Sequence, residues 1–254
     1  LIEYPGDLRR WFHGYLTRDS LVCLFAPIKT GKCVPGDSEV VLADGSIRTI
    51  KALVEDGGPV KVVTLNEKTQ RMEAAQATEF FCSGVKKCWT MRTKSGKKVS
   101  ATADHQFLTS GGWKPLKDIR PGEYIAVPKR LRVFGDQLMA EAEVKFLAYM
   151  MADGCCVQTY GKEADGSRKP AGCAAMFTKT DPILMSDFED SCDCLGINYL
   201  RRGICRKLSG SVQGVLVKLG IRGHSAKTKT IPPCLFKCPK EQVALFLRIL
   251  FSCD

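Results

Sequence analysis

Hydrophobic and polar residues alternate over most of residues 33–130, and this period of two predicts a series of short strands. The stretch DSEVVLADGSIRTI contains two such runs around Asp44-Gly45, a dipeptide suited to a tight hairpin turn. Two further hairpin patterns follow along the chain, the second of them turning at Ser95-Gly96. Many short strands at regular spacing indicate an all-β unit rather than alternating strands and helices.

The period of the pattern changes near residue 136. The stretch DQLMAEAEVKFLAYMMADG carries helix-forming residues and an apolar stripe, and it ends at Gly154, a residue suited to terminating a helix. Beyond it, short strand and helix patterns mix, the charged stretch 161–170 is interpreted as a solvated loop, and residues 239–254 are helical again. We therefore predict a boundary near residue 135, with a β domain before it and an α+β domain after it.

An interrupted phosphate-binding loop precedes the β pattern. A short apolar run leads into APIKTGK at residues 26–32, which has the spacing of a P-loop that cradles nucleotide phosphates. Such a loop finishes with Ser or Thr and opens a helix, but here Cys33 follows, and then Val, Pro and Gly. We therefore expect the polypeptide as it stands not to bind ATP.

Composition narrows the class of protein. The 254 residues carry a net charge of +11, which indicates a polyanionic partner or simply a solvated basic surface. No apolar stretch is long enough to span a bilayer, and the first residues lack a signal peptide, so we expect a cytoplasmic protein with no membrane partner. The thirteen cysteines are accordingly expected to be reduced thiols rather than a disulfide framework.

Cys33 is a nucleophile placed beside the carbonyl group of Lys32. Attack of its thiol on that carbon would convert the amide into a thioester, provided that a nearby group protonates the departing nitrogen. A His beside a hydroxyl could do this, and the chain has three His. One of them lies in SATADHQFLTSGGW, where Thr102 and His105 are three residues apart.

Two stretches resemble the splicing blocks of inteins. CVPGDSEVVLADG is similar to the first block, and GKKVSATADHQFLTSGGWKPLKDIRPGEYIAVPKRL is similar to the second, in the family's order and at its usual separation. The resemblance implies a horseshoe-like, all-β Hint splicing domain over residues 33–135. It also implies that Cys33 performs an N-to-S acyl shift, that His105 protonates or polarises the scissile amide, and that Thr102 helps to position it, without any cofactor.

On this interpretation, residues 1–32 are a host (N-extein) segment. Excision would rejoin Lys32 to a downstream Ser, Thr or Cys and restore a P-loop in which Gly31 and Lys32 bind ATP. The host resembles a P-loop ATPase that acts on DNA, such as a helicase or a packaging motor. We expect the chain to be the N-terminal part of a precursor, so its partners would include the downstream intein and extein sequence, without which splicing is not completed.

Residues 136–254 resemble an incomplete LAGLIDADG homing endonuclease. KFLAYMMADGCC and ALFLRILFSCD are similar to the paired helices of that family, which implies an αββαββα half-domain with a truncated second half. The resemblance makes Asp153 and Asp254 ligands of catalytic Mg²⁺ and Lys229 a candidate for balancing phosphate charge. The implied partner is double-stranded DNA at a homing site, whose backbone the basic stretch YLRRGICRK could line.

Two alternatives stay open. The chain could be a P-loop helicase or packaging ATPase with a β insertion that does not process itself. It could also be an intein that splices but whose endonuclease is degenerate, because Ile249 stands where the helix interface prefers a small residue.

Overall fold

The computed structural model describes residues 33–77, 80–128, 131, 133–162, 166–210, 212–223 and 228–253. The chain divides into two compact units, Leu1–Gly135 and Asp136–Asp254, at the point where the sequence period changes. Residues 1–32, which are predicted to be host sequence, and Asp254 lie outside the described residues, so the predictions made for them stay predictions.

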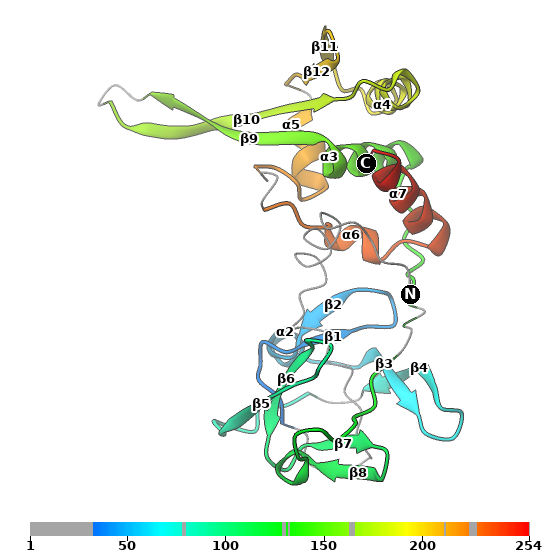
Figure 1. Ribbon diagram of the computed structural model, residues 1–254. Helices are drawn as coiled ribbons and strands as arrows, with labels where there is room; N and C mark the ends of the chain where they lie inside the picture. Colours follow the sequence, from blue (N-terminus) through cyan, green and yellow to red (C-terminus); the bar gives the residue numbers. More distant parts are fainter. Residues whose placement is uncertain are drawn as a thin grey trace. The chain divides into compact units, whose positions relative to one another are not determined.

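The first unit is built from antiparallel hairpins, coloured blue to green in Figure 1. Its paired strands are β1 (Glu39–Val41) with β2 (Ile47–Thr49), β3 (Val60–Asn66) with β4 (Arg71–Ala77), β5 (Cys88–Arg92) with β6 (Lys98–Thr102), and β7 (Gln106–Thr109) with β8 (Gly112–Pro115). Gly45 and Gly96 have φ angles of 83° and 85°. These positive angles favour glycine, and they confirm the two predicted turns.

A helix interrupts this β unit, so the prediction of strands alone was wrong there. Helix α2 (Ile50–Asp56) begins at Thr49, whose hydroxyl accepts a hydrogen bond from the Ala52 N–H, and it ends at Gly57 with a φ of 64°. A short 3-10 turn, η1 (Leu116–Asp118), follows β8. Leu53 of α2 packs into a small core with Val40 and Leu42, so tertiary burial rather than local period stabilises the helix.

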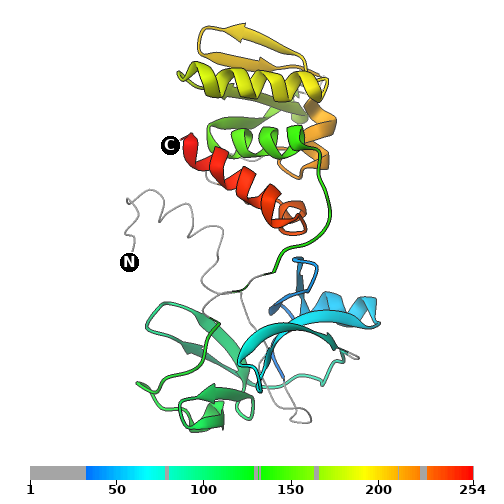
Figure 2. The same cartoon turned by 90° about the vertical axis from the view of Figure 1, so that its right-hand side faces the viewer.

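The second unit combines one four-stranded sheet with helices. Its elements are α3 (Glu141–Ala152), β9 (Gly154–Lys162), β10 (Arg168–Thr178), α4 (Pro182–Cys194), β11 (Tyr199–Arg202), β12 (Cys205–Leu208), α5 (Val212–Lys218), α6 (Pro233–Phe236) and α7 (Lys240–Ser252). The strand order is β11-β12-β10-β9, and every neighbouring pair is antiparallel. Figure 2 shows α3 and α4 lying in front of this sheet. The observed order is therefore α-β-β-α-β-β-α, followed by two further helices.

An aromatic cluster forms the core between the sheet and the helices. Phe146 and Tyr149 of α3, Phe177 of β10 and Phe188 of α4 are almost completely buried, and their ring centroids lie 4.3–5.9 Å apart. Asp187 connects the same two helices, because it accepts hydrogen bonds from the Tyr149 hydroxyl and the Lys145 ammonium at 2.8 Å each. Helix α3 is thereby held in place along its length.

The charged stretch 161–170 is not simply a loop. Strand β9 extends to Lys162 and β10 begins at Arg168, so much of the stretch belongs to a long hairpin that reaches past the helices in Figure 1. The sequence period is weak here, whereas the pairing of the two strands continues outward from the buried sheet.

The expectations about membrane-spanning segments and about reduced cysteines can be compared with the described residues. In that part of the chain, no helix combines the length and the apolarity needed to cross a membrane. Ten of its cysteines carry free thiols, as expected, but Cys156 is disulfide-bonded. The expectation of reduced thiols is therefore wrong for Cys156.

Candidate functional site

The first candidate site surrounds Cys33, which precedes the first hairpin. The backbone N–H of Thr102 donates to the Cys33 carbonyl oxygen at 3.1 Å, and the Thr102 hydroxyl lies 3.5 Å from the same oxygen. Thr102 is the last residue of β6 and is largely buried. The structure therefore brings together two of the three predicted splicing residues, although 69 positions separate them.

His105 lies in the turn that leaves β6. Its backbone N–H donates to the Thr102 carbonyl at 3.0 Å, and its own carbonyl accepts the Leu116 N–H at 2.9 Å. The imidazole is 3% exposed and packs against the ring of Phe107, with the ring centroids 5.0 Å apart. Local backbone bonds thus fix His105 relative to Thr102, and Thr102 in turn holds Cys33.

Two residues that sequence reasoning missed contact the sulfur of Cys33. The Ser83 hydroxyl lies 3.2 Å from Sγ, and the Lys86 ammonium donates to Sγ at 3.3 Å. The hydrogen bond from Ser83 is the main cause that lowers the pKa of Cys33 below its ordinary value; burial opposes the shift, and Lys86 adds to it. No local motif marks either residue, because both lie in the irregular segment between β4 and β5.

A cavity of about 1100 Å³ opens beside these groups. Its walls include Cys33, Thr102, Ser83 and Lys86, together with Lys51 and Glu55 of α2. The nucleophilic sulfur is therefore accessible rather than sealed in the core. Such a half-exposed thiol beside a cation is typical of reactive cysteines.

The second candidate site lies at the carboxyl-terminal end of α3, where Asp153 is the residue that ends the helix. The Lys179 ammonium donates to Asp153 Oδ2 at 2.8 Å and also to the carbonyl oxygen of Cys253, the residue that ends α7. Helices α3 and α7 pack against each other. Sequence reasoning missed Lys179, which follows β10 without any distinctive motif.

Lys229 is a buried lysine rather than an exposed surface charge. Its ammonium donates to the carbonyl oxygens of Met151 and Ala152 at 3.1 Å each, and of Gly154 at 2.6 Å. Burial lowers the pKa of Lys229. These carbonyls flank Asp153, so Lys229 is a cation at the negative end of the helix dipole and fixes the chain on both sides of that carboxylate.

Of the two predicted metal ligands, Asp153 is among the described residues and Asp254 is not. Within their ranges, no group of three or more His, Cys, Asp or Glu side chains is placed to hold a metal ion. The carboxylate of Asp153 and the nearby carbonyl of Cys253 are hard oxygen donors of the kind that Mg²⁺ prefers, and here both contact Lys179. The predicted partner of Asp153, Asp254, directly follows Cys253 but is itself not described.

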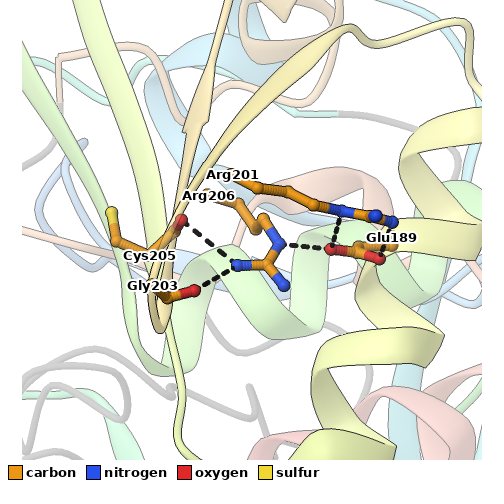
Figure 3. Close-up of polar contacts among 5 residues, drawn as sticks. All are labelled: Glu189, Arg201, Gly203, Cys205 and Arg206. Atoms are coloured by element: carbon orange, nitrogen blue, oxygen red, sulfur yellow. Dashed lines mark hydrogen bonds and ion pairs between the residues drawn. The ribbon is translucent and has the colours of Figure 1, made fainter.

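The basic hairpin β11–β12 divides its charges between two faces. Figure 3 shows Arg201 and Arg206 converging on Glu189 of α4, with Arg201 Nη2 at 2.7 Å from Oε2 and Arg206 Nε on Oε1. Burial opposes ionisation of Glu189, but these two hydrogen bonds hold its pKa below the ordinary value. Because side chains alternate along a strand, Arg202 and Lys207 point to the opposite face, where both are exposed.

Comparison with known proteins gives three kinds of match. The model of the family described as "Intein splicing domain" matches residues 40–233, across both units. The chain is 31% identical over 236 residues to the replicative DNA helicase DnaB of Rhodothermus marinus, and 28% identical over 239 residues to that of Synechocystis sp. PCC 6803. These alignments cover 89% and 91% of this chain but only 24% and 27% of the helicases, so the chain spans about a quarter of the relatives' length.

A solved structure of a DnaB intein from Synechocystis sp. PCC 6803 is also similar. It shares 35% sequence identity, with a TM-score of 0.38, over 39% of this chain and 70% of that chain.

Proposed function

The chain belongs to the intein splicing domain family, and from this premise we propose that it begins protein splicing at the bond between Lys32 and Cys33. Splicing is autocatalytic, so the chain is its own substrate. The proposal rests on one observation: the backbone N–H and the hydroxyl of Thr102 both contact the carbonyl oxygen of Cys33. This contact fixes the residue whose sulfur must attack the preceding peptide bond.

The reaction follows from the positions of these groups. The Cys33 sulfur attacks the carbonyl carbon of Lys32, a sulfur–carbon bond forms, and the bond from that carbon to the Cys33 nitrogen breaks. His105 gives a proton to the departing nitrogen, and the product is a thioester beside a free amine. Thr102 keeps Cys33 from rotating while the bonds exchange. This reaction requires no metal or cofactor.

Thiol-induced cleavage tests the proposal. We expect the chain incubated with dithiothreitol to release residues 1–32, detected by mass spectrometry, because the added thiol captures the thioester. Cys33→Ala should release no peptide, and His105→Ala should slow the release by about 10²–10⁴-fold, the usual contribution of a general acid. Equal release from Cys33→Ala, or no release from the unchanged chain, would contradict the proposal.

The flanking extein sequences are the natural partners of this reaction, since splicing joins them. We propose that residues 1–32 belong to a replicative DNA helicase, which is supported by the helicase matches that cover about nine-tenths of this chain. The spliced host would then regain a P-loop in which Gly31 and Lys32 bind ATP. Retention of ATP by the unspliced chain would instead favour an ATPase with an insertion that does not process itself.

A second function, cleavage of double-stranded DNA at the intein-less site, is proposed for residues 136–254. It is supported by the paired helices α3 and α7, whose carboxyl ends Lys179 connects through Asp153 and Cys253. Asp153 and Asp254 would hold Mg²⁺, which would supply charge stabilisation and an activated water in phosphodiester hydrolysis. The exposed Arg202 and Lys207 suit contact with the DNA backbone.

The two lysines have different roles in this proposal. Lys229 already donates to three carbonyls, which uses all of its N–H groups, so it acts as a positioning residue for Asp153. Lys179, which contacts Asp153 directly, is better placed to balance phosphate charge.

Cleavage of a plasmid tests this second function. The plasmid carries the host coding sequence without the insertion. With Mg²⁺, the full-length precursor should cut it and the precursor that carries Asp153→Asn should not. Equal cutting by both would contradict the assignment of Asp153. No cutting by either would instead support a degenerate endonuclease.

A further inference from the structure

Two donors from one segment meet the sulfur of Cys33. Ser83 and Lys86 lie between β4 and β5, and their side chains are 3.2 Å and 3.3 Å from Sγ, although 50 and 53 residues separate them from Cys33 in sequence. The family resemblance assigns a role to Cys33, Thr102 and His105 only. The contacts at the sulfur itself are therefore left without a function.

We propose that Lys86, assisted by Ser83, is a catalytic residue that stabilises the Cys33 thiolate and orients it for the acyl shift. This inference rests on the proposed splicing function, because it concerns the nucleophile of the first step. Its chemistry differs from that of His105: Lys86 and Ser83 act on the attacking sulfur, whereas His105 acts on the departing nitrogen.

The chemical reason is that the thiolate, not the thiol, attacks the carbonyl carbon. An ammonium group in hydrogen-bond contact with sulfur favours the charged form, and the Ser83 hydroxyl adds a second donor. Near neutral pH an ordinary cysteine, with a pKa of about 8.5, is only a few per cent thiolate. Each unit by which the pKa falls gives about tenfold more nucleophile until the thiolate predominates.

Other titratable groups face the same cavity. Lys51 and Glu55 of α2 line it and lie 3.8 Å apart as an ion pair, which largely offsets their charges. Cys82 and Cys88 also line it. The buried His105 lies in the turn after Thr102. Among the described residues, Lys86 is the cation in contact with Sγ, so the proposal assigns the electrostatic part of the effect to Lys86, beside the hydrogen bond from Ser83.

The acyl shift releases one proton and takes up one proton, so it needs no co-reactant. Cys33 gives its thiol proton to water, the thiolate forms the new bond to the Lys32 carbonyl carbon, and the carbon–nitrogen bond breaks. The nitrogen receives one proton through His105, which water restores. Lys86 remains protonated throughout, so its role is electrostatic and leaves no covalent trace.

The test compares the reactivity of Cys33 in the full chain and in three variants: Lys86→Met, Lys86→Arg and Lys87→Met. The rate of alkylation by iodoacetamide is followed across pH at the Cys33 peptide by mass spectrometry. Lys87 is the matched control, because its ammonium lies over the ring of Trp89, 5.2 Å from the centroid, rather than on the sulfur. Lys86→Met should lower the rate at pH 7 by about tenfold, because a smaller fraction of the sulfur is then thiolate. Lys86→Arg should restore most of the rate, and Lys87→Met should match the unchanged chain.

Thiol-induced release of residues 1–32 provides the second measurement. Lys86→Met should slow release at pH 7 by a similar factor, and the rates should converge above about pH 10, where the thiol ionises without help. An unchanged alkylation profile in Lys86→Met would overturn the inference. So would slowing by the same factor at every pH, which indicates a merely structural role. If the unchanged chain releases no peptide, the splicing proposal fails, whereas the alkylation profile still tests the contact between Lys86 and Cys33.

Discussion

Substitution of Gly154 by alanine tests how closely the backbone packs at the carboxyl-terminal end of α3. A Cβ atom added to it would lie 2.4 Å from the Cα of Met150, 2.6 Å from its carbonyl oxygen and 2.9 Å from its carbonyl carbon. Ordinary contacts between carbon atoms are about 3.5–4.0 Å, so the backbone would have to yield by about 1 Å. Because the obstacle is helix backbone rather than a flexible side chain, Gly154→Ala should destabilise the second unit by about 3 kcal/mol, at the upper end for overpacking.

Gly214 provides a matched control with the opposite sign. It lies within α5, and an added Cβ would meet nothing within 4 Å. Since alanine is favoured over glycine inside a helix by about 1 kcal/mol, Gly214→Ala should stabilise the same unit by about that amount. The two substitutions add the same methyl group, so their difference isolates the close approach at Gly154.

Urea unfolding can follow the two units separately. Trp89 and Trp113 belong to the first unit and residues 136–254 contain no tryptophan, so fluorescence follows the first unit and not the second. Far-ultraviolet circular dichroism is dominated by the longer helices, which belong to the second. With a slope of about 2 kcal/mol per molar urea, Gly154→Ala should lower the dichroism midpoint by about 1.5 M and leave the fluorescence midpoint unchanged. An unchanged dichroism midpoint would refute the packing described for the end of α3.

Three further predictions use the same unfolding assays. Glu189→Gln should destabilise the second unit by about 3 kcal/mol, because the partly buried Arg206 loses its counter-charge. Since the folded-state pKa of Glu189 is lowered, this difference should be present above about pH 4.3 and fade as pH falls through the folded value. A pH-independent difference would contradict it. Phe188→Ala should cost about 3–5 kcal/mol through the cavity left in the aromatic cluster, and a loss below about 1 kcal/mol would show that the cluster is not tightly packed. Thr49→Ala should destabilise the first unit by about 1 kcal/mol, because the Ala52 N–H loses the hydroxyl that accepts its hydrogen bond, and Thr49→Ser should restore the stability. Equal fluorescence midpoints for Thr49→Ala and the unchanged chain would contradict this role.

The sequence by itself determined the elements whose signals are local. Positive φ angles at Gly45 and Gly96 require residues that tolerate them, so the hairpin turns were visible in the sequence. The long helices α3 and α7 follow from apolar periodicity, and Thr102 and His105 share one turn because they are three residues apart. In each case, the interaction that fixes the structure joins residues close together along the chain.

Only the tertiary structure decided which side chains meet at the two sites. Ser83 and Lys86 reach Cys33 across 50 and 53 residues, and Lys229 reaches the end of α3 across more than 70. No periodicity encodes such pairs, because they depend on how strands and helices pack after they form. Lysine, moreover, is common on solvated surfaces, so a lysine in the sequence does not by itself mark a reacting group. The nucleophile was therefore readable from the sequence, whereas the cations around it were set by packing.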